Sequence, residues 1–220
     1  MKRKGIYITA ALVVAALFTG GWQFVANGAA DDAGATARNR EALVRIHSQT
    51  LGRAEAPVQL VEFFDPACGT CAEFYPLVKN MAAEHRDEIR LVLRYAPFHP
   101  GSEQVVKALE ASRRQGKFWQ ALEALLGSQP EWVVHHQAQA DLIWGPLARA
   151  GLDIDRLKAD MQSPDIARVV AQDVADANTL NVSATPEYFV NGRPLPSFGY
   201  EQLRKLVDEE LAIAQSRKAG

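Results

Sequence analysis

The sequence predicts an α/β fold with a helical block inserted between strands, and two observations support this prediction. Apolar β-branched segments alternate with segments of helical spacing, in the order strand, helix, strand, helical block, hairpin, helix. The chain has 220 residues, 48% of them hydrophobic, which suits one domain with a sizeable core. We assign residues 1–30 to an N-terminal signal-anchor or signal peptide, 31–55 to a linker and lead-in, and 56–217 to the folded domain.

The first half of this domain reads as a strand, a helix and a second strand. Residues 58–64 form an apolar run of the length and composition of a buried strand, which Asp65-Pro66-Ala67 ends. Residues 68–84 have helical spacing, and residues 89–95 give the second strand.

The second half begins with a helical insert at about residues 102–178, which has almost no strand signal. A short strand follows at residues 188–190, and Asn191-Gly192 is a strong hairpin turn signal. Residues 200–215 form a closing amphipathic helix.

The N-terminus predicts export. A basic start, Met1 to Lys4, precedes an apolar run over residues 6–25. Since a membrane-spanning helix needs roughly 20 apolar residues, this run suits an uncleaved anchor. Small residues at 26–30 suit a cleaved signal peptide instead. Both alternatives place the rest of the chain outside the cytoplasm, where disulfides persist.

Composition narrows the possible chemistry. With a net charge of −2, no basic excess points to nucleic acid as a partner. Cys68 and Cys71 are the only cysteines, so none is left to form a separate structural disulfide. A zinc site needs about four ligands, and scattered histidines beside one cysteine pair argue against it. A purely structural disulfide would close a very short loop and add little stability.

The position of the pair favours redox chemistry. A cysteine at the N-terminus of a helix faces free backbone N–H groups and the positive end of the helix dipole, which favour its thiolate. We therefore predict that Cys68, the exposed first cysteine, is the nucleophile. Cys71 lies one helical turn further in and would resolve a mixed disulfide.

Glu62 is a charged residue within an otherwise apolar strand, six residues before Cys68. Burying a carboxylate is costly unless it is paired or protonated. Glu62 is therefore a candidate proton carrier for Cys71, although an exposed position at the sheet edge remains open.

Two segments resemble the DsbA-like branch of the thioredoxin superfamily: residues 61–71, which end in Cys68-Gly69-Thr70-Cys71, and residues 185–192, which begin with Thr185-Pro186. Gly116-Lys117-Phe118-Trp119 also resembles the helical insert of that family. The resemblance implies a thioredoxin-like fold with a helical insertion, a cis Pro186 beside the cysteines and Thr185 lining the substrate site. It also implies an acid behind the second cysteine, where Glu62 falls, and no cofactor.

The expected function is disulfide formation in exported, cysteine-containing proteins, with a redox partner that resets the pair. DsbA has a histidine before its second cysteine, whereas this chain has Thr70, so we expect a milder oxidant. A reductase or isomerase, or a thiolate-based metal-handling or chaperone protein, remains an alternative. Tyr95, Phe98 and His99 follow the second strand and could border the site, but we interpret them as packing residues. We interpret His135-His136 as solvated surface.

Overall fold

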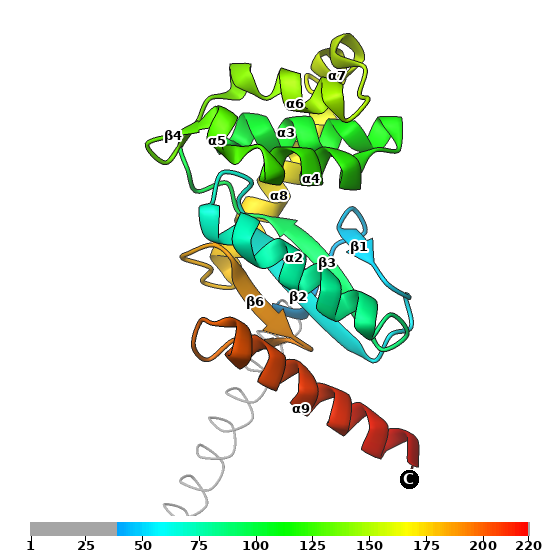
Figure 1. The fold of residues 1–220 in the computed structure, drawn as a ribbon. Coiled ribbons are helices and arrows are strands. Elements are labelled where there is room, and N and C mark those ends of the chain that lie inside the picture. The colour runs from blue at the N-terminus through cyan, green and yellow to red at the C-terminus, as the bar shows by residue number, and fades with distance from the viewer. Residues whose placement is uncertain (1–38, 220) are drawn as a thin grey trace, which may run out of the picture. The chain divides into compact units, whose positions relative to one another are not determined.

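A five-stranded sheet forms the centre of the computed structural model, which describes residues 39–219. The strands are β1 (Gln49–Leu51), β2 (Val58–Phe64), β3 (Ile89–Tyr95), β6 (Glu187–Val190) and β7 (Arg193–Pro194), in the order β1-β3-β2-β6-β7 (Figure 1). Strands β2 and β3 are parallel, and the other neighbours are antiparallel. The predicted α/β fold with both central strands is confirmed.

Burial explains why β2 is nearly continuous in apolar residues. It pairs with β3 on one side and β6 on the other, and six of its seven residues are buried. Because side chains alternate between the faces of a strand, Leu60, Glu62 and Phe64 share one face, while Val61 and Phe63 share the other.

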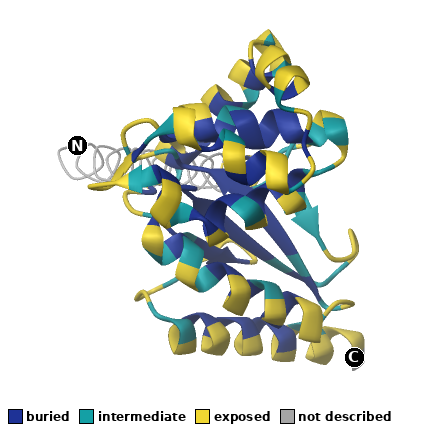
Figure 2. Ribbon diagram, turned by 45° about the horizontal axis from the view of Figure 1, so that its top comes forward, coloured by how far each residue is buried: buried dark blue, intermediate teal, exposed yellow. Residues whose placement is uncertain are grey.

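Helices cover both faces of the sheet. The first core cluster joins Leu60 and Phe64 to α2 (Gly69–Glu84) and α9 (Tyr200–Ala219). The second cluster joins Val61 and Phe63 to Ala177 of α8 (Pro164–Thr179), on the opposite face. Figure 2 shows the strands buried between helices whose outward faces are exposed.

The predicted helical insert, residues 102–178, follows β3 and ends with α8, and the helices before α8 lie at one end of the sheet (Figure 1). The helices of the insert before α8 are α3 (Ser102–Ser112), α4 (Phe118–Gly127), α5 (Gln129–Trp132), α6 (Trp144–Arg149) and α7 (Ile154–Asp160), with 3-10 turns at Arg113–Gln115 and Ala140–Leu142. The sequence did not predict the small hairpin of β4 (Val133–Val134) and β5 (Gln137–Ala138) within it.

The lead-in contributes to the sheet, which the sequence did not show. Strand β1 lies within the predicted lead-in and pairs antiparallel with β3. A buried ionic network joins β3 and the lead-in to α8: Arg94 of β3, which is 0% exposed, donates to Asp173 and Asp176 at 2.7 and 2.6 Å. Arg45 also donates to Asp176, at 2.7 and 2.8 Å.

No helix in residues 39–219 is long and apolar enough to cross a bilayer. The apolar run at residues 6–25, which we interpreted as an anchor or signal peptide, lies outside the described residues.

Candidate active site

The two cysteines lie at the start of α2, at the end of the sheet that faces the insert. Cys68 is the N-cap of the helix, and the Cys71 N–H donates to Cys68 Sγ at 3.4 Å. A capping side chain satisfies one of the N–H groups that the first turn leaves free. Both cysteines are unpaired, so the structure shows the dithiol form.

The surroundings of the two sulfurs shift their pKa values in opposite directions. A hydrogen bond from Cys71 lowers the pKa of Cys68 to about 5, and contacts with Thr185 and backbone N–H groups add to this effect against the opposing effect of burial. Burial raises the pKa of Cys71 well above its usual range, and the charges of Glu62 and Cys68 raise it further. Cys68 is therefore the thiolate at neutral pH.

The prediction that Cys68 is exposed is wrong. Cys68 is 6% exposed and Cys71 is 1% exposed. The cover comes from the loop before β6, where the carbonyl oxygen of Thr185 lies 3.1 Å from Cys68 Sγ and accepts its hydrogen bond in the thiol form. The small exposed part of Cys68 nevertheless borders a surface cavity of about 610 Å³.

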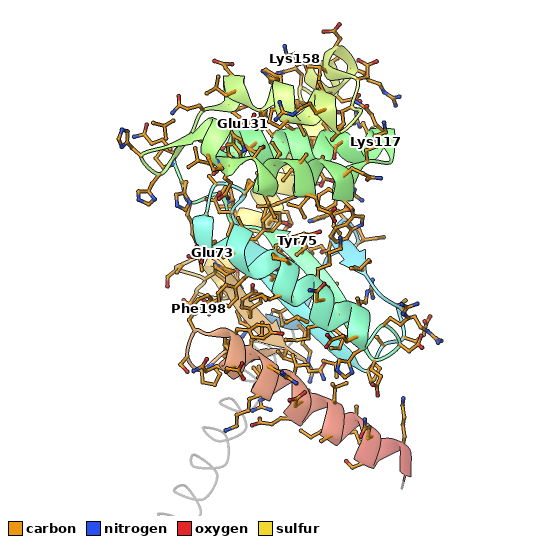
Figure 3. All side chains as sticks on the ribbon, in the orientation of Figure 1. Glu73, Tyr75, Lys117, Glu131, Lys158 and Phe198 are labelled. Carbon is orange, nitrogen blue, oxygen red and sulfur yellow. The ribbon has the colours of Figure 1, made fainter. Side chains whose placement is uncertain are left out.

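Thr185 lies beside Cys68, and Pro186 follows it in the loop before β6. The peptide bond between them is cis, as the resemblance implies. Thr185 borders the cavity that contains Cys68 and also a second cavity, of about 360 Å³, which includes Pro186 and Phe198. Figure 3 shows Glu73 and Phe198 on the same side of the molecule, near the start of α2.

Glu62 is buried, at 2% exposure, which excludes the alternative of an exposed edge position. Its partner in the register of β2 and β6 is Tyr188. Glu62 Oε2 and the Tyr188 hydroxyl have no hydrogen-bond partner among the described residues. Burial raises the pKa of Glu62 to about 8, although Tyr188 lowers it in part.

Asp65 organises the loop before Cys68, a role that sequence reasoning missed. Its buried carboxylate accepts from Ala67 N at 2.8 Å, from the Ser102 hydroxyl, and from His99 N and Nδ1 at 2.7 and 2.8 Å. An acidic residue between a strand and the cysteine motif was the only available signal. Tyr95 is buried as expected, but Phe98 and His99 border the Cys68 cavity.

Gln129, from α5 of the insert, was also missed. Its amide donates to the carbonyl oxygens of Pro66 and Cys68, at 2.7 and 3.0 Å. The insert therefore holds the backbone of the cysteine motif directly.

Two adjacent histidines lie in the β4–β5 hairpin. His135 and His136 are exposed, as expected, and His136 borders the Cys68 cavity. The described part of the chain contains no cluster of three or more metal-ligating side chains.

Known proteins resemble the chain in both sequence and fold. A family model described as Thioredoxin matches residues 45–209. A thioredoxin-like oxidoreductase from Silicibacter pomeroyi DSS-3 is 30% identical, with a TM-score of 0.68, over 82% of this chain and 99% of that chain. Wolbachia pipientis alpha-DsbA1 has a TM-score of 0.70 over 81% of this chain and 98% of that chain, at 17% identity, which shows the fold alone.

A further set of relatives carries another name. A Na(+)/H(+) antiporter NhaA from Herminiimonas arsenicoxydans is 34% identical over 66% of this chain but only 22% of its own length. The chain spans about a quarter of the first such relatives, between 21% and 26%. That name describes whole proteins of which this chain matches a minor part.

The fold and the site together define a class of protein. In this class, a mixed sheet carries a dithiol at a helix N-terminus, near a cis proline. The chain belongs to the thioredoxin family, and its helical insert gives it the DsbA-like form of that fold.

Proposed function

We propose that this protein is an extracytoplasmic thiol–disulfide oxidoreductase that forms disulfides in exported proteins through Cys68 and Cys71. The observation that carries the proposal is the asymmetry of the pair: Cys68 caps α2 and has a pKa of about 5, whereas Cys71 is buried with a raised pKa. A low-pKa thiolate is the better leaving group in thiol–disulfide exchange. The similarity to a protein named as a thioredoxin-like oxidoreductase supports it.

The reaction starts from the oxidised pair. A substrate thiolate attacks Cys68 Sγ and forms a mixed disulfide, and the electron pair of the broken Cys68–Cys71 bond goes to the Cys71 sulfur. Glu62, with a pKa of about 8, is mostly protonated at neutral pH and gives its proton to Cys71. A second substrate thiolate then attacks the substrate sulfur of the mixed disulfide and releases Cys68 as a thiolate.

Substrate would bind against Thr185, which borders both cavities, and Pro186, which borders the cavity of about 360 Å³. The substrates are cysteine-containing exported proteins, and the reduced pair needs a redox partner that removes two electrons per cycle. Neither role requires a bound cofactor.

The location rests on the basic start and the apolar run at residues 6–25. A reporter that is active only in the cytoplasm, fused to the C-terminus, should stay silent in cells. Fractionation would then distinguish an uncleaved anchor from a cleaved signal peptide. Strong reporter activity would contradict the location and weaken the proposed direction of disulfide formation.

The activity is tested with the two single-cysteine variants. Cys68→Ser should abolish exchange with a two-cysteine peptide. Cys71→Ser should accumulate mixed disulfides with the disulfide form of that peptide, because the Cys68 thiolate attacks the peptide disulfide and no Cys71 thiol then displaces the peptide. Alkylation of the reduced protein at mildly acidic pH should label Cys68 before Cys71, with a midpoint near 5. Faster labelling of Cys71 would show that the roles are assigned wrongly.

A further inference from the structure

The cavity that borders Cys68 has a second wall that the proposed mechanism does not use. The first wall consists of the start of α2 and the loop before β6. The second consists of Phe98, His99 and Pro100 from the loop after β3, and of His136 from the hairpin of the insert. Two imidazoles therefore face the same space as the reactive sulfur.

His99 is held in a defined orientation. Its backbone N–H and its Nδ1 both lie within hydrogen-bond distance of Asp65 Oδ2, at 2.7 and 2.8 Å. Asp65 is fully buried, whereas the His99 side chain is 23% exposed. When Nδ1–H donates to the carboxylate, the neutral ring carries its lone pair on Nε2. This arrangement leaves Nε2 as a proton acceptor.

His136 occupies a turn position where histidine is an unfavourable choice. His135 and His136 are the two central residues between β4 and β5, with φ angles of 50° and 60°. A two-residue turn with both φ angles positive is best formed by Asn-Gly. The rings of His136 and His99 lie 6.4 Å apart with an interplanar angle of 28°. Residues held in sparsely populated backbone conformations cluster at functional sites.

The hairpin is fixed against the loop that carries His99. Ala138 N donates to the carbonyl oxygen of Pro100 at 2.8 Å. Gly101 has a φ of 84°, and a Cβ at that position would fall on the Ala138 carbonyl. A glycine is therefore required for this close approach, which sets the position of His136 relative to His99.

We propose that His99 is a further catalytic residue, which takes the proton of the incoming substrate thiol, and that Asp65 and His136 are positioning residues for it. The inference rests on the proposed function. The substrate S–H proton moves to His99 Nε2, the resulting thiolate attacks Cys68 Sγ, and the electron pair of the Cys68–Cys71 bond goes to Cys71. His99 then releases its proton to solvent. In the reverse direction, it returns a proton to the departing substrate sulfur.

The chemistry needs such a group because Thr70 cannot titrate. An ordinary cysteine has a pKa near 8.5, so it is mostly protonated at neutral pH and needs a group that can take its proton. The titratable groups that face His99 are Asp65 from the end of β2, His136 from the hairpin, and Cys68 and Glu73 across the cavity.

The first test measures mixed-disulfide formation by the oxidised protein with two single thiols, an ordinary cysteine peptide and an aryl thiol that is already ionised at pH 7. His99→Asn keeps a donor toward Asp65 and removes Nε2. It should slow the peptide reaction by roughly tenfold or more at pH 7. A positioned general base typically contributes about 10²- to 10⁴-fold, so this expectation is a modest one. The rate with the aryl thiol should be unchanged, because that thiol needs no base.

The matched control is His85→Asn, since His85 also pairs with a carboxylate, Glu88, but lies at the far end of α2. It should leave both rates unchanged. An equal loss with both thiols in His99→Asn would overturn the proposal, as would unchanged rates. A wild-type protein that exchanges with neither thiol would contradict the proposed function itself.

A second variant separates an effect on the reaction from an effect on protein stability. Replacing His135 and His136 with Asn-Gly should raise the melting temperature, because the new residues suit the turn. The same variant should slow the peptide reaction and spare the aryl thiol. A stabilised protein with an unchanged peptide rate would overturn the role of His136, and His99→Gln provides a second substitution if His99→Asn folds poorly.

Discussion

Glu62 is a side chain whose burial lowers the stability of the folded protein at neutral pH. The folded protein holds the carboxyl proton up to a pKa of about 8, compared with 4.5 for an ordinary glutamate. Above pH 4.5 the Glu62 carboxyl group ionises in the unfolded chain but stays protonated in the folded protein. The free energy of unfolding therefore falls as the pH rises toward 8. The loss approaches about 3 kcal/mol at pH 7, as an upper bound.

Glu62→Gln should therefore have two opposite effects. The amide cannot give a proton to Cys71, so exchange should slow and its dependence on pH should flatten. The same change should raise the free energy of unfolding more at pH 7 than at pH 5, because the amide carries no charge to bury. Urea unfolding at both pH values, beside a pH–rate profile, checks this. Equal stability changes at the two pH values would contradict the raised pKa.

The sequence pointed to candidate site residues within local motifs. It did not point to the residues that form hydrogen bonds to the backbone around them. Cys68, Cys71, Glu62, Thr185 and Pro186 could be proposed because each lies in a local motif or breaks a local pattern. Asp65, His99 and Gln129 act through contacts between residues 34 to 63 positions apart. Spacing along one chain carries no information on such pairs.

At the scale of elements, the insert contributes to the site through α5. Gln129→Ala would remove both hydrogen bonds to the backbone before α2, each worth about 1 kcal/mol. We expect a less stable protein and a slower reaction at Cys68. Gln104→Ala, at an exposed position on α3, is the matched control and should change neither quantity. A variant with lower stability but an unchanged rate would limit Gln129 to a structural role.

The elements that the sequence predicted are those with a long hydrophobic pattern, such as β2, β3 and α2. Strand β1 has three residues, all half-buried, and the strands of the β4–β5 hairpin have two each. Segments of that length complete neither a period-2 nor a helical pattern. Their pairing partners define them instead, which only the folded molecule shows.

Across the whole molecule, the network around Arg94 links the lead-in, β3 and α8. Burial pushes the pKa of Asp176 upward, but hydrogen bonds from Arg45 and Arg94 outweigh this and lower it. A lowered carboxyl pKa stabilises the fold above the unfolded value of 3.8, and this contribution disappears as the pH falls through the folded pKa. The network should therefore weaken in acid.

Asp176→Asn should lower the free energy of unfolding by about 3–5 kcal/mol at pH 7, as expected when one partner of a buried ion pair is removed. The difference from the wild type should narrow below about pH 4. Asp87→Asn removes an exposed ion pair with Arg53 and should change stability by less than about 1 kcal/mol. A difference that stays constant with pH would contradict the ionic contribution.

The reduction potential is another property of the whole protein. Hydrogen bonds and the end of α2 stabilise the Cys68 thiolate, without an adjacent imidazolium at Thr70. We expect a potential below the roughly −120 mV of DsbA and above the roughly −270 mV of thioredoxin. Equilibration of the protein with glutathione buffers gives the value. A potential close to that of thioredoxin would favour a reductase or isomerase over disulfide formation.

The two edge strands of the sheet would suit a protein that handles unfolded chains. Unfolded substrates present extended segments that can add to an open strand and begin aggregation. Here the outermost strands are β1, with three residues, and β7, with two residues including Pro194. Such short edges offer almost no ladder of free backbone groups, and a proline donates none. In the proposed reaction, a substrate would therefore reach Cys68 without being recruited into the sheet of this protein.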